Sequence, residues 1–306
     1  MPAAATAEAL LEQLKDLRVK NVHDPLTVVH VGQQLLERRF AAKRGEQVWT
    51  VLEQIGSAAA ECGQFDLAEV CASRLDAQFP DSPRVALLLG AIAEAKGQTD
   101  AAVAIYNREI KKDATNTAAR KRLIAMHLHA PSSNDKGKGV ANTTYLSKTK
   151  GIDMLVQFLD TFYNDMDAWV QLAEAYQSLQ LYSQSLSAIS NLILLAPFNP
   201  FYLLWHAETA YTVQDFALAY KEFLRVIELT EGVSTKGGIG RRAAIGVKMC
   251  LTRLSSSTTN DNTFKPTRQP EIDLLMTKLI IKSYEHRDAS MKPEIKEWIG
   301  DEPVVR

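Results

Sequence analysis

The chain has 306 residues, 35 Lys and Arg against 36 Asp and Glu, and 46% hydrophobic residues. This composition excludes an intrinsically disordered chain, a collagen-like fibre and a disulfide-dense scaffold. The net charge of −1 disfavours sequence-independent binding of nucleic acid, which requires a basic surface that displaces counterions from phosphates. We therefore expect an ordinary soluble globular chain, with one large domain or two of common size.

Cysteine usage and apolar runs point to a reducing compartment without a membrane span. Cys62, Cys71 and Cys250 form no Cys-x-x-Cys motif and have no histidine at ligand spacing, which predicts buried thiols instead of a disulfide or a zinc site. Residues 1–14 lack the basic and apolar regions of a signal peptide. The most apolar stretch, 186–205, is interrupted by two prolines and two asparagines, so we expect any membrane association to occur through a partner.

Apolar residues spaced three and four apart predict helices along most of the chain. Two N-terminal helices are expected, followed by paired helices, and a glycine-rich breaker at 232–240 precedes two more helices. The last residues, 291–306, are expected to dock or fray. In chain order, the expected helical segments are 8–20, 25–40, 47–79, 83–112, 118–129, 150–163, 167–195, 200–229, 241–254 and 271–285.

A period of 34 residues relates the paired helices. Gly56 and Ala68, for example, recur 34 residues later as Gly90 and Ala102. Small residues at these positions allow two helices to approach closely, and large aromatic residues elsewhere fill the space between them. A helical hairpin of this size cannot bury its apolar face alone, so consecutive hairpins are expected to stack.

The clearest repeat reads Trp-x2-Leu-Ala-x2-Tyr, then Ser-x3-Ile and Pro, between Trp169 and Pro197. This pattern resembles the tetratricopeptide repeat. A second unit starts at Leu52, 117 residues before Trp169. Three periods of 34 residues leave 15, which the Pro/Gly/Ser/Asn/Lys-rich segment 131–145 supplies as an inserted loop. The predicted fold class is all-α, a tetratricopeptide-repeat α-solenoid of stacked antiparallel helix pairs.

The expected organisation has three parts. Residues 1–45 are N-terminal helices that cap the solenoid. Residues 46–231 form the repeat array, with the loop insertion at about 131–147. Residues 232–306 are C-terminal helices with a polar flexible segment at about 255–270.

Motifs that could carry chemistry are weak, so we expect no enzyme, no catalytic residue, no cofactor and no metal. His127 and His129 lie two residues apart and point to different helix faces, whereas a metal pair on one helix needs a spacing of three or four. The basic, glycine-rich segment 236–242 lacks the phosphate-loop motif and follows a helix instead of a strand. His206 replaces a leucine of the repeat core and is expected to be a hydrogen-bonded core histidine.

Stacked hairpins present an extended concave surface, lined mainly by the first helix of each pair. The group near Pro200 is rich in aromatic residues, a composition typical of interaction hot spots. The alternative is that Phe201 and Leu204 pack against the neighbouring repeat. The residues predicted to face a partner are Arg84, Leu87, Ala91, Glu94, Phe201, Leu204, Glu208 and Tyr211.

The segment from Arg38 to Leu75, with FPDSPRV, AWVQLAEAY and NPFYLLWHAETAY further on, is similar to the family of subunit 2 of the endoplasmic-reticulum membrane protein complex. The resemblance covers about 38–229. It implies a cytosolic scaffold without catalytic activity, peripheral to the membrane. Implied partners are the other subunits, including membrane-embedded subunits with cytosolic segments and a soluble cytosolic subunit. The implied role is support for inserting tail-anchored and multi-pass proteins into the membrane.

Two other classes of function were considered. A tetratricopeptide adaptor that binds chaperone C-terminal peptides would need a basic carboxylate clamp, but the corresponding early groove positions are Glu53 and Ser57. An enzyme with an accessory repeat domain would need a separate catalytic fold, for which the array and its flanks leave no space.

Overall fold

The computed structural model describes residues 7–37, 47–129, 147–230, 238–256, 264 and 266–284. Within these ranges the chain forms helices and turns and no strand. It divides into two compact units, Met1–Gly151 and Ile152–Arg306. The segment 291–306 and all but the last residue of the expected insertion at 131–147 lie outside the described residues, as does half of the segment 255–270.

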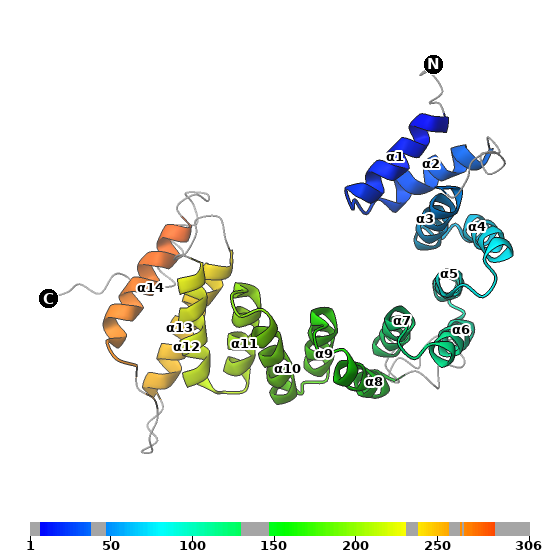
Figure 1. Ribbon diagram of the computed structural model, residues 1–306. Coiled ribbons are helices and arrows are strands. Elements are labelled where there is room, and N and C mark those ends of the chain that lie inside the picture. Colours follow the sequence, from blue (N-terminus) through cyan, green and yellow to red (C-terminus); the bar gives the residue numbers. More distant parts are fainter. Residues whose placement is uncertain are drawn as a thin grey trace, which may run out of the picture. The chain divides into compact units, whose positions relative to one another are not determined.

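The helices of each unit follow one another in space in chain order (Figure 1). The boundary between the units falls within α8, Lys148–Thr161. The first unit contains α1 (Ala7–Val19), α2 (Pro25–Glu37), α3 (Gln47–Glu61), α4 (Phe65–Gln78), α5 (Pro83–Ala95), α6 (Thr99–Lys112) and α7 (Thr117–Leu128). The second contains α9 (Met166–Ser178), α10 (Tyr182–Leu195), α11 (Pro200–Thr212), α12 (Phe216–Leu229), α13 (Gly238–Ser256) and α14 (Gln269–Ser283).

The helix bounds confirm the repeat period. The second helices of successive hairpins begin 34 residues apart, α4 and α6 in the first unit and α8, α10 and α12 further along. From the start of α6 to the start of α8 the spacing is 49 residues, one period plus the 15 that the sequence assigned to the inserted loop. In four hairpins the first helix packs on its own second helix: α3 on α4, α5 on α6, α9 on α10 and α11 on α12. The all-α tetratricopeptide-repeat fold is therefore confirmed.

One predicted helix start is wrong. The sequence treated Gly238 and Gly240 as part of a breaker, yet α13 begins at Gly238. The first four N–H groups of a helix have no intrahelical partner, so glycine in the first turn weakens no internal hydrogen bond. The helix packs on α11 and α12, and α14 packs on α13. Tertiary packing thus extends the helix through glycines that propensity alone disfavours.

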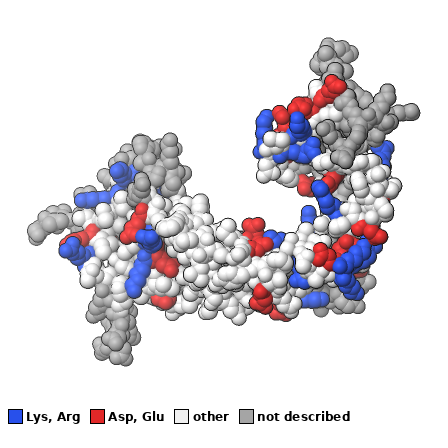
Figure 2. Space-filling model, viewed as in Figure 1, with Lys and Arg blue, Asp and Glu red and all other residues white. Residues whose placement is uncertain are grey.

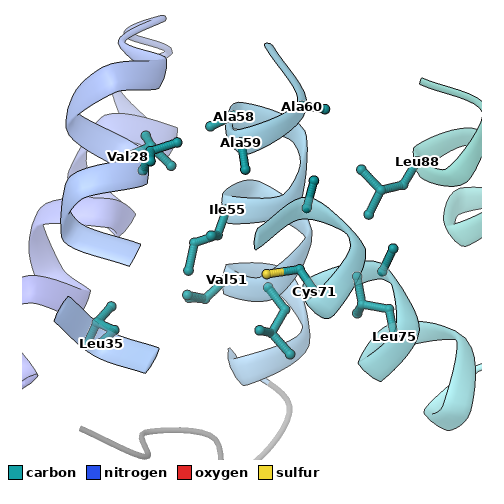
Figure 3. Close-up of a cluster of buried hydrophobic side chains, with 14 of the residues drawn as sticks. Val28, Leu35, Val51, Ile55, Ala58, Ala59, Ala60, Cys71, Leu75 and Leu88 are labelled. Atoms are coloured by element: carbon teal, nitrogen blue, oxygen red, sulfur yellow. The ribbon is translucent and has the colours of Figure 1, made fainter. Parts of the chain in front are cut away.

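Each unit has its own hydrophobic core. In the first unit, α2, α3, α4 and α5 supply Val28, Ile55, Leu75 and Leu88, which lie within one cluster (Figure 3). In the second, Phe223 of α12 lies in a cluster with residues of α11, α13 and α14. Buried apolar area contributes about 25 cal/mol per Å², so these clusters are the main stabilising contribution to each unit.

The turn between the two helices of a hairpin needs a left-handed residue. In the first unit this residue is Gly63 (φ 73°) and, one period later, Gly97 (φ 76°). In the second unit it is Gln180 (φ 60°) and Gln214 (φ 71°). Glycine adopts this conformation without steric cost, whereas a residue with a Cβ is strained there.

None of the described helices combines the length and the apolar composition that crossing a bilayer requires. This agrees with the interrupted apolar stretch in the sequence.

Candidate protein-interaction site

An ion pair links the first helices of two successive hairpins in the first unit. Arg84, predicted to face a partner, is the second residue of α5, and its side chain is 74% exposed. Its Nε and one terminal nitrogen donate to the two carboxylate oxygens of Glu53 in α3, at 3.0 and 2.7 Å. The bidentate geometry orients both side chains, although an exposed pair of this kind contributes little stability.

A cavity of about 320 Å³ opens beside this ion pair. Its apolar wall includes Trp49 of α3 and Phe79, whose rings meet edge to face with centroids 5.5 Å apart. Phe79 remains 41% exposed. The remaining lining residues are Thr50, Glu53, Leu75, Ser82, Arg84, Val85 and Leu88. The cavity combines an aromatic wall with a charged rim, which suits an apolar side chain of a bound polypeptide.

The other predicted residues of α5 are less open. Leu87 and Ala91 are half-buried. The Glu94 carboxylate lies 3.4 Å from Arg122 of α7, which repeats the link between first helices. Burial raises the pKa of the Tyr106 hydroxyl, and the neighbouring Glu94 carboxylate adds to that effect. Glu94 therefore belongs as much to the packing of the hairpin as to its surface.

In the second unit, Phe201 and Leu204 have different environments. Phe201 is 62% exposed at the start of α11, as predicted for a partner-facing residue. The placement of Leu204 on that face is wrong, because its side chain is 3% exposed. It belongs to the cluster that α11 shares with α12, α13 and α14. The packing alternative considered for these residues is thus realised at Leu204.

Glu208 and Tyr211 complete the predicted group on α11. Glu208 accepts two hydrogen bonds from Arg242 of α13, at 3.1 and 2.8 Å, so the link between first helices recurs in this unit. The Tyr211 ring meets Phe216 with centroids 5.1 Å apart, and Arg253 approaches its hydroxyl at 3.5 Å. Both side chains are half-buried. The assignment of this group to partner binding remains a prediction.

One buried cluster has the spacing of a serine–histidine–carboxylate triad. His206 Nε2 lies 2.9 Å from Ser190 Oγ, and His206 Nδ1 lies 2.5 Å from Glu222 Oε2. Ser190, however, donates its hydroxyl proton to the carbonyl of Leu186 within α10. Its neighbours are helical, so their N–H groups are used in the helix and offer no oxyanion hole. His206 is 5% exposed and links three helices, which confirms the core-histidine interpretation.

Other reactive side chains are also buried. His127 is 3% exposed, accepts a hydrogen bond from the Ser147 N–H at 3.3 Å, and has its pKa lowered by burial. The described residues hold no group of three or more potential metal ligands. Burial raises the pKa of Cys71 to about 11 and that of Cys250 to about 12, so both thiols stay protonated at neutral pH. These two thiols are core residues, as expected.

Sequence reasoning missed the partners of the predicted residues. Trp49 and Phe79 were not identified as a cavity wall, and Arg122 and Arg242 were not recognised as ion-pair partners. A signal was present, because each of three glutamates is followed by an arginine about one period later. The pairs are Glu53 with Arg84, Glu94 with Arg122, and Glu208 with Arg242.

These stacked hairpins define a tetratricopeptide-repeat protein. A solved bacterial structure, the C-terminal part of a TPR repeat-containing protein from Cytophaga hutchinsonii, superposes with a TM-score of 0.57. The superposition covers 93% of this chain and 96% of that chain at 14% identity, which supports the fold alone.

Sequence comparison identifies the family. The model of the EMC2 TPR-like repeat domain matches residues 83–223. ER membrane protein complex subunit 2-A of Xenopus laevis is 34% identical over 227 residues, 73% of this chain and 71% of the frog protein. Subunit 2-B of the same species is 32% identical over 255 residues, 82% of this chain and 78% of that protein. The chain belongs to the family of ER membrane protein complex subunit 2.

Proposed function

We propose that the chain is a non-catalytic scaffold subunit of an endoplasmic-reticulum membrane protein complex, held at the cytoplasmic face of the membrane through its partners. Membership of the subunit 2 family supports this assignment, and a helical-repeat family points to protein binding instead of enzymatic activity. In this role the chain supports the insertion of tail-anchored and multi-pass proteins by holding the cytosolic parts of other subunits.

The first-helix faces are the proposed binding surface for cytosolic segments of membrane-embedded subunits. Another face would bind a soluble cytosolic subunit. On the first-helix faces, the charged pair of Arg84 and Glu53 and the exposed Phe201 offer both polar and apolar contacts. The proposed contact residues are Arg84, Leu87, Glu94, Phe201, Glu208 and Tyr211.

The observation that carries this proposal is an exposed apolar corner where α10 meets α11. Leu194, Phe198 and Phe201 are 73%, 74% and 62% exposed. Helix α10 has no charged residue, and Glu208 is the one acidic residue of α11. Figure 2 shows the corresponding uncharged surface. Aromatic residues without neighbouring charges are typical of the centre of a protein interface.

Affinity purification of the tagged full chain from detergent-solubilised membranes tests the proposal. The wild-type chain should retain integral-membrane partners. Phe201→Ala should reduce their yield several-fold, because aromatic anchors at an interface centre contribute about 2 kcal/mol or more each. The bound proteins are identified and quantified by mass spectrometry.

Leu26→Ala in α2 is the matched control, because Leu26 is 73% exposed but lies in the other unit. It should leave the yield unchanged, and both variants should keep the helical circular dichroism of the wild type. Equal recovery of membrane partners with both variants would contradict the surface assignment. Recovery of chaperones without membrane proteins would favour the adaptor function.

A further inference from the structure

A groove in the second unit lies apart from the surface already described. It has a volume of about 460 Å³ and is bounded by α8 and α10, the second helices of successive hairpins, with α9 as its floor. Trp169, Leu172 and Tyr176 form the floor on α9. One wall is Val156, Leu159 and Asp160 on α8 with Tyr163 just after it, and the other is Gln184, Ser187, Ala188 and Asn191 on α10.

The groove is aromatic at one end and has a fixed shape there. The Tyr163 and Trp169 rings meet edge to face with centroids 5.5 Å apart. Trp169 Nε1 donates to the Tyr163 carbonyl at 2.8 Å, and the Tyr163 hydroxyl donates to Asn191 Oδ1 at 3.2 Å. These bonds hold both rings in place although Tyr163 is 45% exposed. A preformed apolar site of this kind avoids the entropy cost of ordering on binding.

The two walls differ in charge. Asp160 is exposed on α8, and Asp153 lies seven residues earlier on the same helix face. Asp153 is close enough to Tyr176 to add to the rise that burial causes in the pKa of that hydroxyl. Within the described ranges neither carboxylate has a basic partner. The α10 wall carries amides and a hydroxyl and no charge.

The backbone around the groove is helical, so its hydrogen-bonding groups are already paired. A bound segment therefore cannot add a strand here and must be recognised through side chains. The lining residues on α10 span about two helical turns, roughly 11 Å. This is the geometry of a groove that receives the apolar face of an amphipathic helix.

We propose that this groove binds a basic amphipathic helix of a partner protein. The apolar stripe of that helix lies on Trp169 and Tyr176. Two Lys or Arg side chains seven residues apart face Asp153 and Asp160, whose spacing they match. This interface is separate from the first-helix faces, so it stands whether or not the scaffold function is correct.

Three labelled 18-residue helical peptides test the proposal against the full chain by fluorescence anisotropy. They share one leucine stripe and carry Lys, Gln or Glu at two positions seven residues apart. Affinity should fall in that order, with the Gln peptide about fivefold weaker, since an exposed ion pair contributes up to about 1 kcal/mol. Added salt should weaken binding of the Lys peptide most.

Substitutions locate the binding to the groove. The double variant Asp153→Lys with Asp160→Lys should reverse the preference, so that the Glu peptide binds more tightly than the Lys peptide. Val156→Glu, at a wall residue 38% exposed, should weaken all three peptides at least tenfold. Val70→Glu in α4 is the matched control, because Val70 is 44% exposed on a second helix of the other unit.

Three results would overturn the proposal. One is equal binding of the Lys and Glu peptides. Another is an equal loss of binding with Val70→Glu and Val156→Glu. The third is a concentration-dependent dimer in sedimentation that Val156→Glu abolishes, which would make a second copy of the chain the occupant.

Discussion

The hairpins α3–α6 and α9–α12 have the same design, with helix ends offset by 117 residues, yet they present different surfaces. Charged residues of the first unit correspond to apolar residues of the second at several positions, and six of these pairs show the difference. The pairs are Glu53 and Val170, Asp81 and Phe198, Arg84 and Phe201, Glu94 and Tyr211, Glu109 and Val226, and Lys112 and Leu229.

The charges of the first unit are neutralised within the chain. Arg84 pairs with Glu53, and Lys112 pairs with Asp81 at 3.0 Å and with Glu109 at 3.2 Å. In the second unit the equivalent positions hold the exposed residues Phe198 and Phe201, which carry no charge and so need no oppositely charged partner. One repeat backbone thus supports a surface that is complete in itself and another that gains from being covered.

The largest expected effect comes from exchanging the residues of the one buried pair, Glu109 and Val226. Val226→Glu should destabilise the second unit by about 3–5 kcal/mol, because it buries a carboxylate where Lys112 has no counterpart and where the neighbouring Arg225 is exposed and already paired with Glu228. Val226 is 0% exposed, and the residue in the place of Lys112 is Leu229. The urea midpoint followed by circular dichroism measures the change.

The reverse exchange, Glu109→Val, is the counterpart in the first unit. Glu109 is 3% exposed, and Lys112 keeps Asp81 as a partner after its removal. A well-packed apolar residue in place of a buried carboxylate whose cations, Lys112 and Arg108, are themselves exposed is neutral or stabilising, here by about 1–2 kcal/mol. If Glu109→Val loses as much stability as Val226→Glu, the two units do not differ in how they tolerate an apolar residue and a carboxylate at this position.

The second effect concerns the direction of an aromatic ring. Tyr106 and Phe223 hold equivalent places in α6 and α12, but a Cβ at Gly90 would lie 2.5 Å from Tyr106, whereas a Cβ at Gly246 would lie 2.5 Å from Phe223. The Tyr106 ring thus packs on α5, the first helix of its own hairpin. The Phe223 ring packs on α13, the helix that follows its hairpin. Gly90→Leu should therefore destabilise the first unit by about 3 kcal/mol through overpacking, measured as a fall in the urea midpoint.

Gly56→Ala is the control for that variant. A Cβ at Gly56 would meet the flexible Leu88 side chain at 3.1 Å, which can shift, and the Cβ of Cys71 at 3.3 Å, which requires a small adjustment between α3 and α4. The gain in helix propensity, about 1 kcal/mol, offsets that adjustment. An unchanged midpoint for Gly90→Leu would contradict the close approach of Tyr106 to α5.

The period and the helix pairs could be predicted because they depend on local spacing. Small residues at Gly56 and Gly90 and apolar residues three and four apart suffice to place the helices. The start of α13 could not be predicted in this way, because it depends on packing against α11 and α12, elements that local propensity does not include.

The third effect concerns the left-handed turn residues. Gln214→Gly should stabilise the second unit by about 1 kcal/mol, because glycine adopts φ near 71° without the steric clash of a Cβ. Gly97→Gln in the first unit should destabilise by a similar amount. Thermal unfolding of both variants measures these shifts, and a lower melting temperature for Gln214→Gly would contradict the prediction.

The site was less predictable than the fold. Periodicity placed Leu204 on the same face as Phe201, since the two positions are three apart on α11. It could not show that α13 would share a core with this helix and leave Leu204 3% exposed while Phe201 stays open. Which side of a first helix is covered depends on contacts with the neighbouring hairpin, and the sequence pattern within one helix does not contain those contacts.

The smallest expected effect tests whether the backbone holds successive first helices in the same geometry in both units, so that a surface ion pair can form equally well in each. Val170→Glu combined with Phe201→Arg places the Glu53–Arg84 pair in α9 and α11. A double-mutant cycle should give a coupling of about 0.5 kcal/mol, equal to that of Glu53 and Arg84, since both pairs are solvent-exposed. If this geometry is shared, the double variant keeps its stability and loses the partners that Phe201 is proposed to bind. A coupling of zero in the second unit, with a measurable one in the first, would mean that the exchanged side chains and not the repeat backbone set the geometry between first helices.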